Sequence, residues 1–190
     1  YEASVFRARI DDAITSFEVP EFSGGGRDFF RNAGRSTRNG LEMAASARLG
    51  NEWRIRAGYT WSDFEFDRFE TPDGDFSGNR LLGVPRHRGF AALDWTGPGG
   101  YYAGADLRAA GEVIADNANT AASPDYAVVD VHLGRNFPAG RVDFDLSAGI
   151  SNLFDERYID NVRVNAFGGR FFEPAPGISY HVALSLHWNG

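Results

Sequence analysis

The chain closes on a segment in which every second residue is apolar, and this segment limits the folds open to it. In ISYHVALSLHWNG, residues 178–190, the apolar positions run from Ile178 to Trp188 and the positions between them are small or polar. A period of two sends alternate side chains to opposite faces of a strand. Half-buried strands of soluble proteins usually keep this pattern for about four to eight residues, whereas a membrane-spanning strand needs about 9 to 11. The segment has the length of a membrane-spanning strand.

The same alternation recurs along the chain, with an apolar face and a polar or charged face in most segments. In the first segment the phase is ambiguous. The pattern predicts about eight strands, at residues 2–19, 29–49, 53–69, 84–96, 101–115, 125–137, 141–157 and 173–188.

The connections between these strands alternate in length. Short turns are expected at 50–52, 96–100 and 138–140, and long polar or glycine-rich loops at 20–28, 70–83, 116–124 and 158–172. Outer-membrane barrels have short turns on the periplasmic side and long loops outside. Aromatic residues gather near both strand ends, as in interfacial girdles: Trp53, Trp95, Tyr101, Phe137 and Trp188 near the turns, and Tyr59, Trp61, Tyr126 and Tyr180 near the loops.

Composition removes several classes of protein. There is no run of about 18 apolar residues, so the sequence predicts no transmembrane helix. A net charge of -7 argues against a nucleic-acid partner, and the absence of Cys excludes disulfides and thiolate metal sites. No signal peptide opens the chain, so we expect a removed leader or a piece of a longer protein.

Two other β folds remain open at this point. One is a soluble β-barrel binding protein, although charged residues such as Arg54, Arg56 and Asp106 suit a water-filled or plugged lumen better than a small apolar interior. The other is a self-contained eight-stranded outer-membrane barrel that acts as an adhesin or a lipid-modifying enzyme.

Several motifs resemble the C-terminal half of a TonB-dependent outer-membrane receptor. The stretch NLFDERYIDNVRVNAFGGRFFEPAPGISYHVALSLHW, residues 152–188, resembles the closing N-L-F-D-x-x-Y segment and the proline-rich approach to the final strand. FRNAGRSTRNGLEMAASARL, residues 30–49, resembles the N-A-G-x(5)-G-x-E strand, and GVPRHR, residues 83–88, resembles the V-P-x-H start of another strand. The sequence differs at its end, where Asn189 and Gly190 follow Trp188 although the family commonly stops on an aromatic residue.

The resemblance implies an all-β fold, an antiparallel transmembrane β-barrel segment of about eight strands within a 22-stranded barrel of the parent. Residues 1–190 would be its C-terminal part, without the plug and the earlier strands. The implied function is TonB-dependent uptake of a scarce nutrient, most commonly a ferric siderophore, with no enzymatic step and no cofactor. The implied partners are outer-membrane lipid, the remaining barrel and plug of the parent, TonB through the absent N-terminal part and a siderophore-like ligand, in the outer membrane of a Gram-negative cell.

The long loops hold the candidate ligand contacts, because a rigid barrel presents its loops to ligands. Cations and aromatic rings together suit an anionic or aromatic metal chelate. The candidates are Arg27, Phe29, Phe30, Arg80, Arg86, Arg163, Arg170, Phe171 and Phe172. For any one of them, a solvated loop residue or a girdle member is the plainer interpretation.

Other motifs are expected to be structural. Asn152 to Asp155 would end a strand at the loop side, and Pro174 and Pro176 would interrupt pairing before the last strand. Gly34 and Gly40 would permit bulges or close backbone approach. The stretch TPDGDFSG, residues 71–78, lacks the positions of a calcium loop and predicts a turn.

Overall fold

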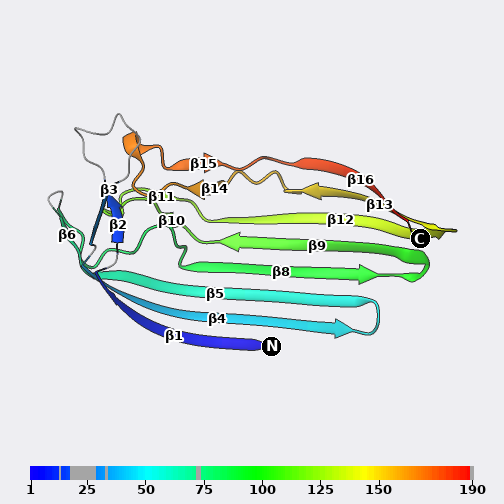
Figure 1. Ribbon diagram of the computed structural model, residues 1–190, viewed down its shortest axis with the longest axis horizontal. Coiled ribbons are helices and arrows are strands. Elements are labelled where there is room, and N and C mark those ends of the chain that lie inside the picture. The colour runs from blue at the N-terminus through cyan, green and yellow to red at the C-terminus, as the bar shows by residue number, and fades with distance from the viewer. Residues whose placement is uncertain (13, 18–28, 33, 72–73, 189–190) are drawn as a thin grey trace.

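The computed structural model describes residues 1–12, 14–17, 29–32, 34–71 and 74–188, with only the backbone described for 14–17 and 29–32. One eight-stranded sheet runs through the molecule, with neighbouring strands antiparallel and in chain order (Figure 1). Its strands are β1 (Glu2–Asp11), β4 (Arg35–Leu49), β5 (Trp53–Arg68), β8 (His87–Thr96), β9 (Tyr101–Ala110), β12 (Tyr126–Ala139), β13 (Val142–Ser151) and β16 (Ser179–Trp188). The predicted all-β fold with eight strands is confirmed.

Several strands end earlier than predicted on the loop side. Strand β13 stops at Ser151 because Asn152 has a φ of 54°, a left-handed conformation that cannot continue a strand. Strand β1 stops at Asp11, before Asp12 with a φ of 57°. The predicted strands ran past these residues, to 19 and to 157, so they were too long at this end.

Four small two-stranded sheets extend the hairpins at one end of the main sheet, which we call the loop end (left in Figure 1). They are β2 (Ile14–Phe17) with β3 (Phe29–Asn32), β6 (Glu70–Thr71) with β7 (Gly74–Asp75), β10 (Val113–Ile114) with β11 (Ala122–Ser123), and β14 (Ile159–Val162) with β15 (Phe172–Pro174). The opposite end, the turn end, has the short connections at 50–52, 97–100 and 140–141, where the 3₁₀ turn η2 (Pro98–Gly100) lies. The predicted asymmetry of loops and turns is confirmed for the described residues.

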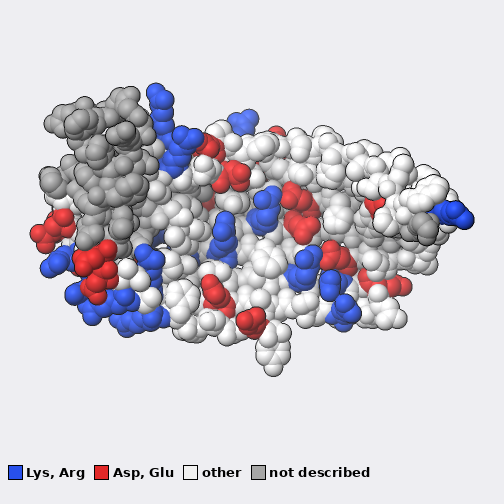
Figure 2. All heavy atoms as spheres, in the orientation of Figure 1, with Lys and Arg blue, Asp and Glu red and all other residues white. Residues whose placement is uncertain are grey.

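One face of the main sheet is charged, and the strand register shows how its side chains meet. Arg54 lies directly opposite Asp94, and Asp106 lies opposite Asp130. His132 belongs to the same face, where its ring lies across Gly104 of the neighbouring strand. Figure 2 shows acidic and basic side chains spread over this face. We call it the charged face.

The other face is apolar and exposed, and we call it the apolar face. In register across five strands it presents Trp53, Trp95, Ala103, Leu133 and Ala148. On β16, Leu184 is 60% exposed. Exposed apolar surface of this extent marks an interaction surface, and here it runs along whole strands. Trp53 and Trp95 pack together at the turn end with their ring centroids 6.3 Å apart.

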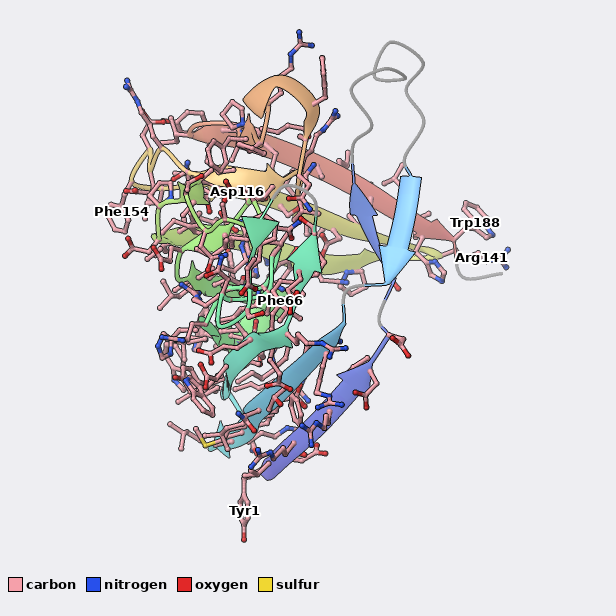
Figure 3. The ribbon with its side chains drawn as sticks, turned by 90° about the vertical axis from the view of Figure 1, so that its left-hand side faces the viewer. Tyr1, Phe66, Asp116, Arg141, Phe154 and Trp188 are labelled. Carbon is pink, nitrogen blue, oxygen red and sulfur yellow. The ribbon has the colours of Figure 1, made fainter. Side chains whose placement is uncertain are left out.

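The sheet curves into an open arc. Figure 3 looks along the strands from the loop end and shows the arc running from β1, where Tyr1 is labelled, to β16, with the charged face on the inside. Strands β1 and β16 are the two edges, and among the described residues they do not pair with each other. No helix among the described residues is long and apolar enough to cross a membrane.

Two glycines on β4 and just before it allow close approach, as predicted. Gly34 has a φ of 67°, and a Cβ atom there would lie 2.2 Å from the carbonyl oxygen of Arg68. The register shifts directly after it, at Arg35. At Gly40 the ring of Phe6 occupies the space where a Cβ atom would lie.

Candidate functional site

Three loops meet at the loop end and form one structure, which we call the platform: residues 69–86, 111–125 and 152–178. Backbone bonds join them in pairs. The N–H of Gly83 donates to the carbonyl of Ile114 at 3.0 Å, and the N–H of Asn165 donates to the carbonyl of Ala115 at 2.8 Å. Segments far apart in the sequence are therefore fixed to one another above the charged face.

Asn119 binds the first loop to the second as if it were a backbone partner. Its Oδ1 accepts the N–H of Arg80 at 2.8 Å, and its Nδ2 donates to the carbonyl of Arg80 at 3.1 Å. Asn119 has a φ of 57°, a conformation that Asn tolerates better than most residues. The side chain of Asn79 adds a bond from Nδ2 to the carbonyl of Asn117 at 2.7 Å.

Asp116 organises the loop that contains Asn119. Its carboxylate accepts the N–H of Thr120 at 2.8 Å, the N–H of Ala121 at 3.1 Å and the hydroxyl of Thr120. Burial alone would raise the pKa of Asp116, but these bonds to the charged form outweigh it, and the pKa lies below its ordinary value. The carboxylate is held in its ionised form as part of the loop structure.

The platform has a small aromatic core. Phe66 and Phe69 are buried, and their ring centroids lie 4.6 Å apart. Phe76 and Leu81 pack against this pair. In Figure 3, Phe66 and Asp116 lie near the middle of the arc when it is viewed from the loop end.

The NLFD stretch begins the third loop as a structural turn, as predicted. Asn152 is buried, and its side chain bonds the backbone N–H and carbonyl of Glu156, both at 2.8 Å. Asp155 Oδ1 accepts the N–H of Ile178 at 2.9 Å, directly before β16. The motif therefore fastens the end of β13 to the start of the last strand.

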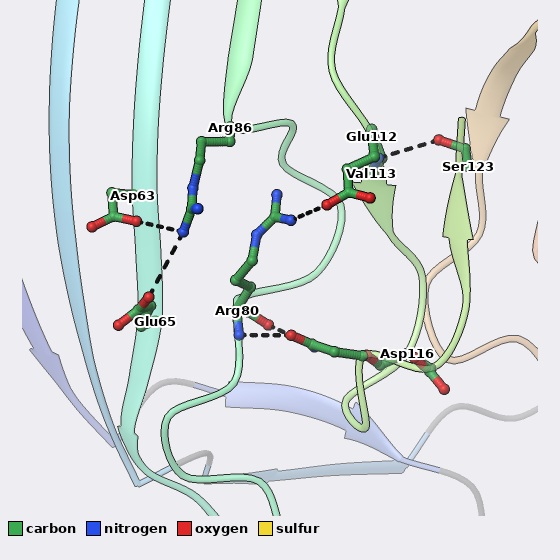
Figure 4. A network of polar contacts seen from close by, with 9 residues as sticks. Asp63, Glu65, Arg80, Arg86, Glu112, Val113, Asp116 and Ser123 are labelled. Carbon is green, nitrogen blue, oxygen red and sulfur yellow. Dashed lines mark hydrogen bonds and ion pairs between the residues drawn. The ribbon is translucent and has the colours of Figure 1, made fainter. Parts of the chain in front are cut away.

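Two of the predicted cations lie in the first loop and are ion-paired (Figure 4). Arg80 binds Glu112 at 2.5 Å, and only 19% of its side chain is exposed. Arg86 binds Asp63 at 2.8 Å and lies 3.8 Å from Glu65. Arg80 joins the first loop to the second, and Arg86 joins the first loop to β5, so a ligand would have to share both guanidinium groups with these carboxylates.

The structure brings four candidates together in the third loop. Arg163 binds Glu173 at 2.5 Å across β14 and β15, and the rings of Phe171 and Phe172 meet edge to face at 5.9 Å. Arg170 is exposed and, in the part of the chain that the structure describes, has no ion pair. Of the predicted loop cations that the structure describes, Arg170 is therefore the most available to an anion.

Glu173 connects this hairpin further. The amide of Asn161 donates to its carboxylate at 2.9 Å. This bond and the nearby Arg163 lower the pKa of Glu173 below its ordinary value, against a smaller opposing effect of desolvation.

The remaining candidates lie between β1 and β4, outside the platform. Phe29 and Phe30 lie in β3 and pair through their backbones with Phe17 and Ser16. Arg27 lies outside the described residues, as do Asn189 and Gly190. The role of all the candidates in ligand binding stays a prediction.

A cavity of about 370 Å³ lies beneath the platform, in part against the charged face. Its lining includes Arg88, Phe90 and Arg108 from the sheet and Asp160 from β14. Arg108 binds Asp130 at 3.0 Å, whereas Arg88 has no ion pair among the described residues. The cavity combines an aromatic ring with an unpaired cation, the mixture sought in the loops.

Sequence reasoning missed both Arg88 and the asparagines of the platform. Arg88 sits inside the VPRHR motif, but its inward direction follows from the register of β8, with Thr60 opposite it. The asparagine bonds join residues that are 38 to 48 positions apart, and the one local signal was the polar run DNANT, residues 116–120.

The platform and the sheet can bind but show no sign of catalysis among the described residues. No group of three or more His, Asp or Glu there could hold a metal ion. Within the stretch at 71–78, Pro72 and Asp73 lie outside the described residues, so the turn there stays a prediction; in the described part Asp75 accepts the N–H of Ser77 at 2.9 Å. The described site is a mixed polar and aromatic surface next to the charged face of the sheet.

Comparison with known proteins agrees with this architecture. Residues 1–153 match the family model described as TonB dependent receptor-like, beta-barrel. The ferrioxamine B receptor of Salmonella typhimurium (strain LT2) is 27% identical over 164 residues, which cover 84% of this chain and 22% of the receptor. The metal-pseudopaline receptor CntO of Pseudomonas aeruginosa (strain PAO1) is 28% identical over 165 residues, with the same coverage.

Solved structures show the same fold. The siderophore receptor PiuA from Acinetobacter baumannii superposes with a TM-score of 0.75 at 24% identity, over 96% of this chain and 25% of that one. The copper transporter OprC gives a TM-score of 0.69 at 22% identity, over 96% and 28%. The chain thus spans about a quarter of each solved protein and about a fifth of the curated relatives. These relatives are named as receptors and transporters, not as enzymes.

Proposed function

The chain belongs to the TonB-dependent receptor β-barrel family of the Gram-negative outer membrane, and from this premise we propose that it takes part in the uptake of a metal chelate, most plainly a ferric siderophore. The relatives support the ligand class, since they are named for ferrioxamine B, for metal-pseudopaline and as a siderophore receptor. Uptake would consist of capture, plug movement and release, with no bond made or broken.

We further propose that residues 1–190 form the C-terminal part of the parent barrel, with the plug and the earlier strands supplied elsewhere in the parent. The single observation that carries this is the open sheet with one charged and one apolar face. A self-contained eight-stranded barrel would need β1 to pair with β16, and among the described residues these strands are opposite edges. A soluble barrel would not expose a row such as Leu133, Leu184 and Trp188.

In this proposal the anionic part of the chelate contacts the exposed Arg170 and then the unpaired Arg88 beneath the platform. Phe172 offers a ring at the first place and Phe90 at the second. Charge-assisted bonds and stacking on aromatic faces are the interactions that suit such a ligand. The predicted candidates Arg80, Arg86 and Arg163 contribute by holding the loops, because each is bound to a carboxylate.

The test is uptake by cells that depend on the full-length receptor for iron. A strain without the receptor is complemented with the receptor gene and grown under iron limitation with a panel of ferric siderophores, including ferrioxamine B, while uptake of radioactive iron is measured. We expect at least one siderophore to restore uptake, and to do so only when TonB is present. Uptake that is independent of TonB, or absent for every siderophore and for copper, would contradict the proposal.

Variants of the receptor then locate the ligand. Arg88→Gln should reduce uptake about tenfold, the loss expected for one charge-assisted bond of about 1.4 kcal/mol. The matched control is Arg157→Gln, since Arg157 is likewise exposed and without an ion pair among the described residues but lies in the third loop, outside the lining of the cavity. Equal loss in both variants would show a general effect of charge and would remove Arg88 from the site.

A further inference from the structure

Arg135 is a cation within the apolar face. In register across the sheet it lies between Tyr101 of β9 and Leu146 of β13. A charged side chain directed toward hydrocarbon is costly, and long cationic side chains near the end of a span reach the headgroup region instead. Arg135 lies level with Tyr101, the first residue of β9 at the turn end.

Two aromatic rings hold the guanidinium group. Its central carbon lies 4.6 Å from the centroid of the Tyr101 ring and 5.6 Å from that of Phe137. Both contacts are within the range of cation–π attraction. The ring of Phe137 in turn stacks on Phe144 at 5.5 Å with an interplanar angle of 6°. The cation thus lies beside two stacked, nearly parallel aromatic rings.

The short turn between β8 and β9 fixes the direction of the side chain. Arg135 Nε donates to the carbonyl of Gly99 at 3.1 Å. This carbonyl is in reach because the turn approaches β12 closely: a Cβ atom on Gly100 would lie 1.9 Å from the carbonyl oxygen of Asn136. With Nε engaged, the two terminal nitrogens are the donors left for another partner.

No such partner comes from the protein in the part that is described. Arg135 is exposed and has no carboxylate within 4.0 Å among the described residues, whereas Arg56 and Arg108 on the charged face each bind an aspartate. The guanidinium group of Arg135 is therefore held in one direction, without a described carboxylate partner, on a face that lipid covers.

We propose that Arg135 binds the phosphate of a glycerophospholipid in the periplasmic leaflet of the outer membrane. The planar guanidinium group matches a phosphate with two parallel bonds, which a point charge cannot do. The phosphate supplies the missing anion at headgroup depth, and the Phe137 and Phe144 rings contact the glycerol and the first acyl carbons. The inference rests on the membrane placement of the sheet and is independent of the transported ligand.

The test uses the full-length receptor purified in a non-ionic detergent, with phosphatidylglycerol added as the probe and bound lipid counted by native mass spectrometry. Arg135→Gln should weaken the tightest binding event about fivefold to tenfold, the effect of one cation near an anionic lipid surface. Arg135→Lys keeps the charge but loses the paired geometry and should lie between Gln and the unchanged receptor. Binding of diacylglycerol, which lacks the phosphate, should be the same in all variants.

Arg141→Gln is the matched control, because Arg141 lies exposed in the turn between β12 and β13 without a described aromatic contact. Unchanged lipid binding in Arg135→Gln, or an equal loss in Arg141→Gln, would overturn the proposal. The Lys variant provides the comparison if the Gln variant does not fold, which the heat-dependent mobility of the barrel on gels reports. Siderophore uptake by these variants should remain normal, so failure of lipid binding and failure of the proposed uptake are separate results.

Discussion

The platform and the sheet beneath it are stabilised in different ways. The platform has a buried aromatic core at Phe66 and Phe69 and side chains that bond across loops, such as Asn119 to Arg80. The middle of the sheet is one layer thick, with exposed apolar side chains such as Leu184 on one face. The platform is thus stabilised by its own buried side chains and hydrogen bonds, whereas the sheet depends on its ladder of backbone bonds and on the lipid that covers it.

The first prediction, with the largest effect, is a substitution that destabilises the platform and leaves the sheet intact. Phe69→Ala removes a ring that is 1% exposed and should destabilise the platform by about 3–5 kcal/mol. Hydrogen exchange should show faster exchange at Phe76, whose N–H donates to the carbonyl of Phe69 at 2.8 Å, and unchanged exchange in β9 and β12. Phe154→Ala is the control, since its side chain is 72% exposed and, as Figure 3 shows, points away from the platform core. Equal loss of protection across sheet and loops would show that they are one cooperative unit.

The next prediction is a substitution that destabilises the sheet and leaves the platform intact. Leu184→Arg places a charge on the apolar face halfway between Tyr180 and Trp188, and should cost about 2–4 kcal/mol at that depth. Ala183→Arg adds the same side chain to the charged face of the same strand and should cost far less. The measurement is denaturant unfolding of the full-length receptor in lipid vesicles. Similar costs for both variants would mean that the apolar face does not contact lipid.

A smaller effect tests the bonds between the loops. Asn119→Ala removes both bonds to Arg80 and should cost the platform about 1–3 kcal/mol, because partly buried backbone groups lose their partners. Asn119→Gly can adopt a φ of 57° without strain. It should therefore recover only the part of the lost stability that comes from backbone strain in the alanine variant. Limited proteolysis within 78–86 reports the result. Full recovery in the glycine variant would show that the conformation of residue 119, and not its bonds, stabilises the platform.

The smallest effect is a decrease in the stability of the platform at low pH. Asp116 has a pKa lowered below its ordinary value of 3.8, so its folded carboxylate stabilises the platform above that pH, and the stabilisation is lost as the pH falls through the lowered pKa. Glu173 has the same sign. Hydrogen exchange at Thr120 and Ala121, corrected for intrinsic rates, should show protection that is constant at mild pH and decreases below about pH 4. In Asp116→Asn this decrease should disappear, and a decrease that persists would assign it to another group.

The sheet was predictable from sequence, whereas the platform was not. Alternation depends only on neighbouring residues, so it identified all eight strands and the apolar row of the last one, which includes Leu184. It failed at the end of β1, where the left-handed conformation of Asp12 stops the strand, whereas the NLFD motif had marked the end of β13 at Asn152.

The candidate site shows the same division. Sequence placed Arg80 correctly in a long loop, but its partner Glu112 lies 32 residues away and could not be identified. Arg88 was missed because its availability depends on which neighbouring cations are paired. Such pairing follows from register and loop packing, which appear only in three dimensions.

The most direct test of the account is the environment of alternate residues along one strand in the membrane. The chain has no Cys, so single spin labels can be attached at 144 to 151 of β13 in a cysteine-free full-length receptor reconstituted in lipid vesicles. We expect labels at Phe144, Leu146, Ala148 and Ile150 to collide with oxygen dissolved in the lipid, and labels between them to collide with a water-soluble relaxation agent. Equal accessibility along the strand, or the reversed order of the two sets, would contradict the membrane sheet on which the rest depends.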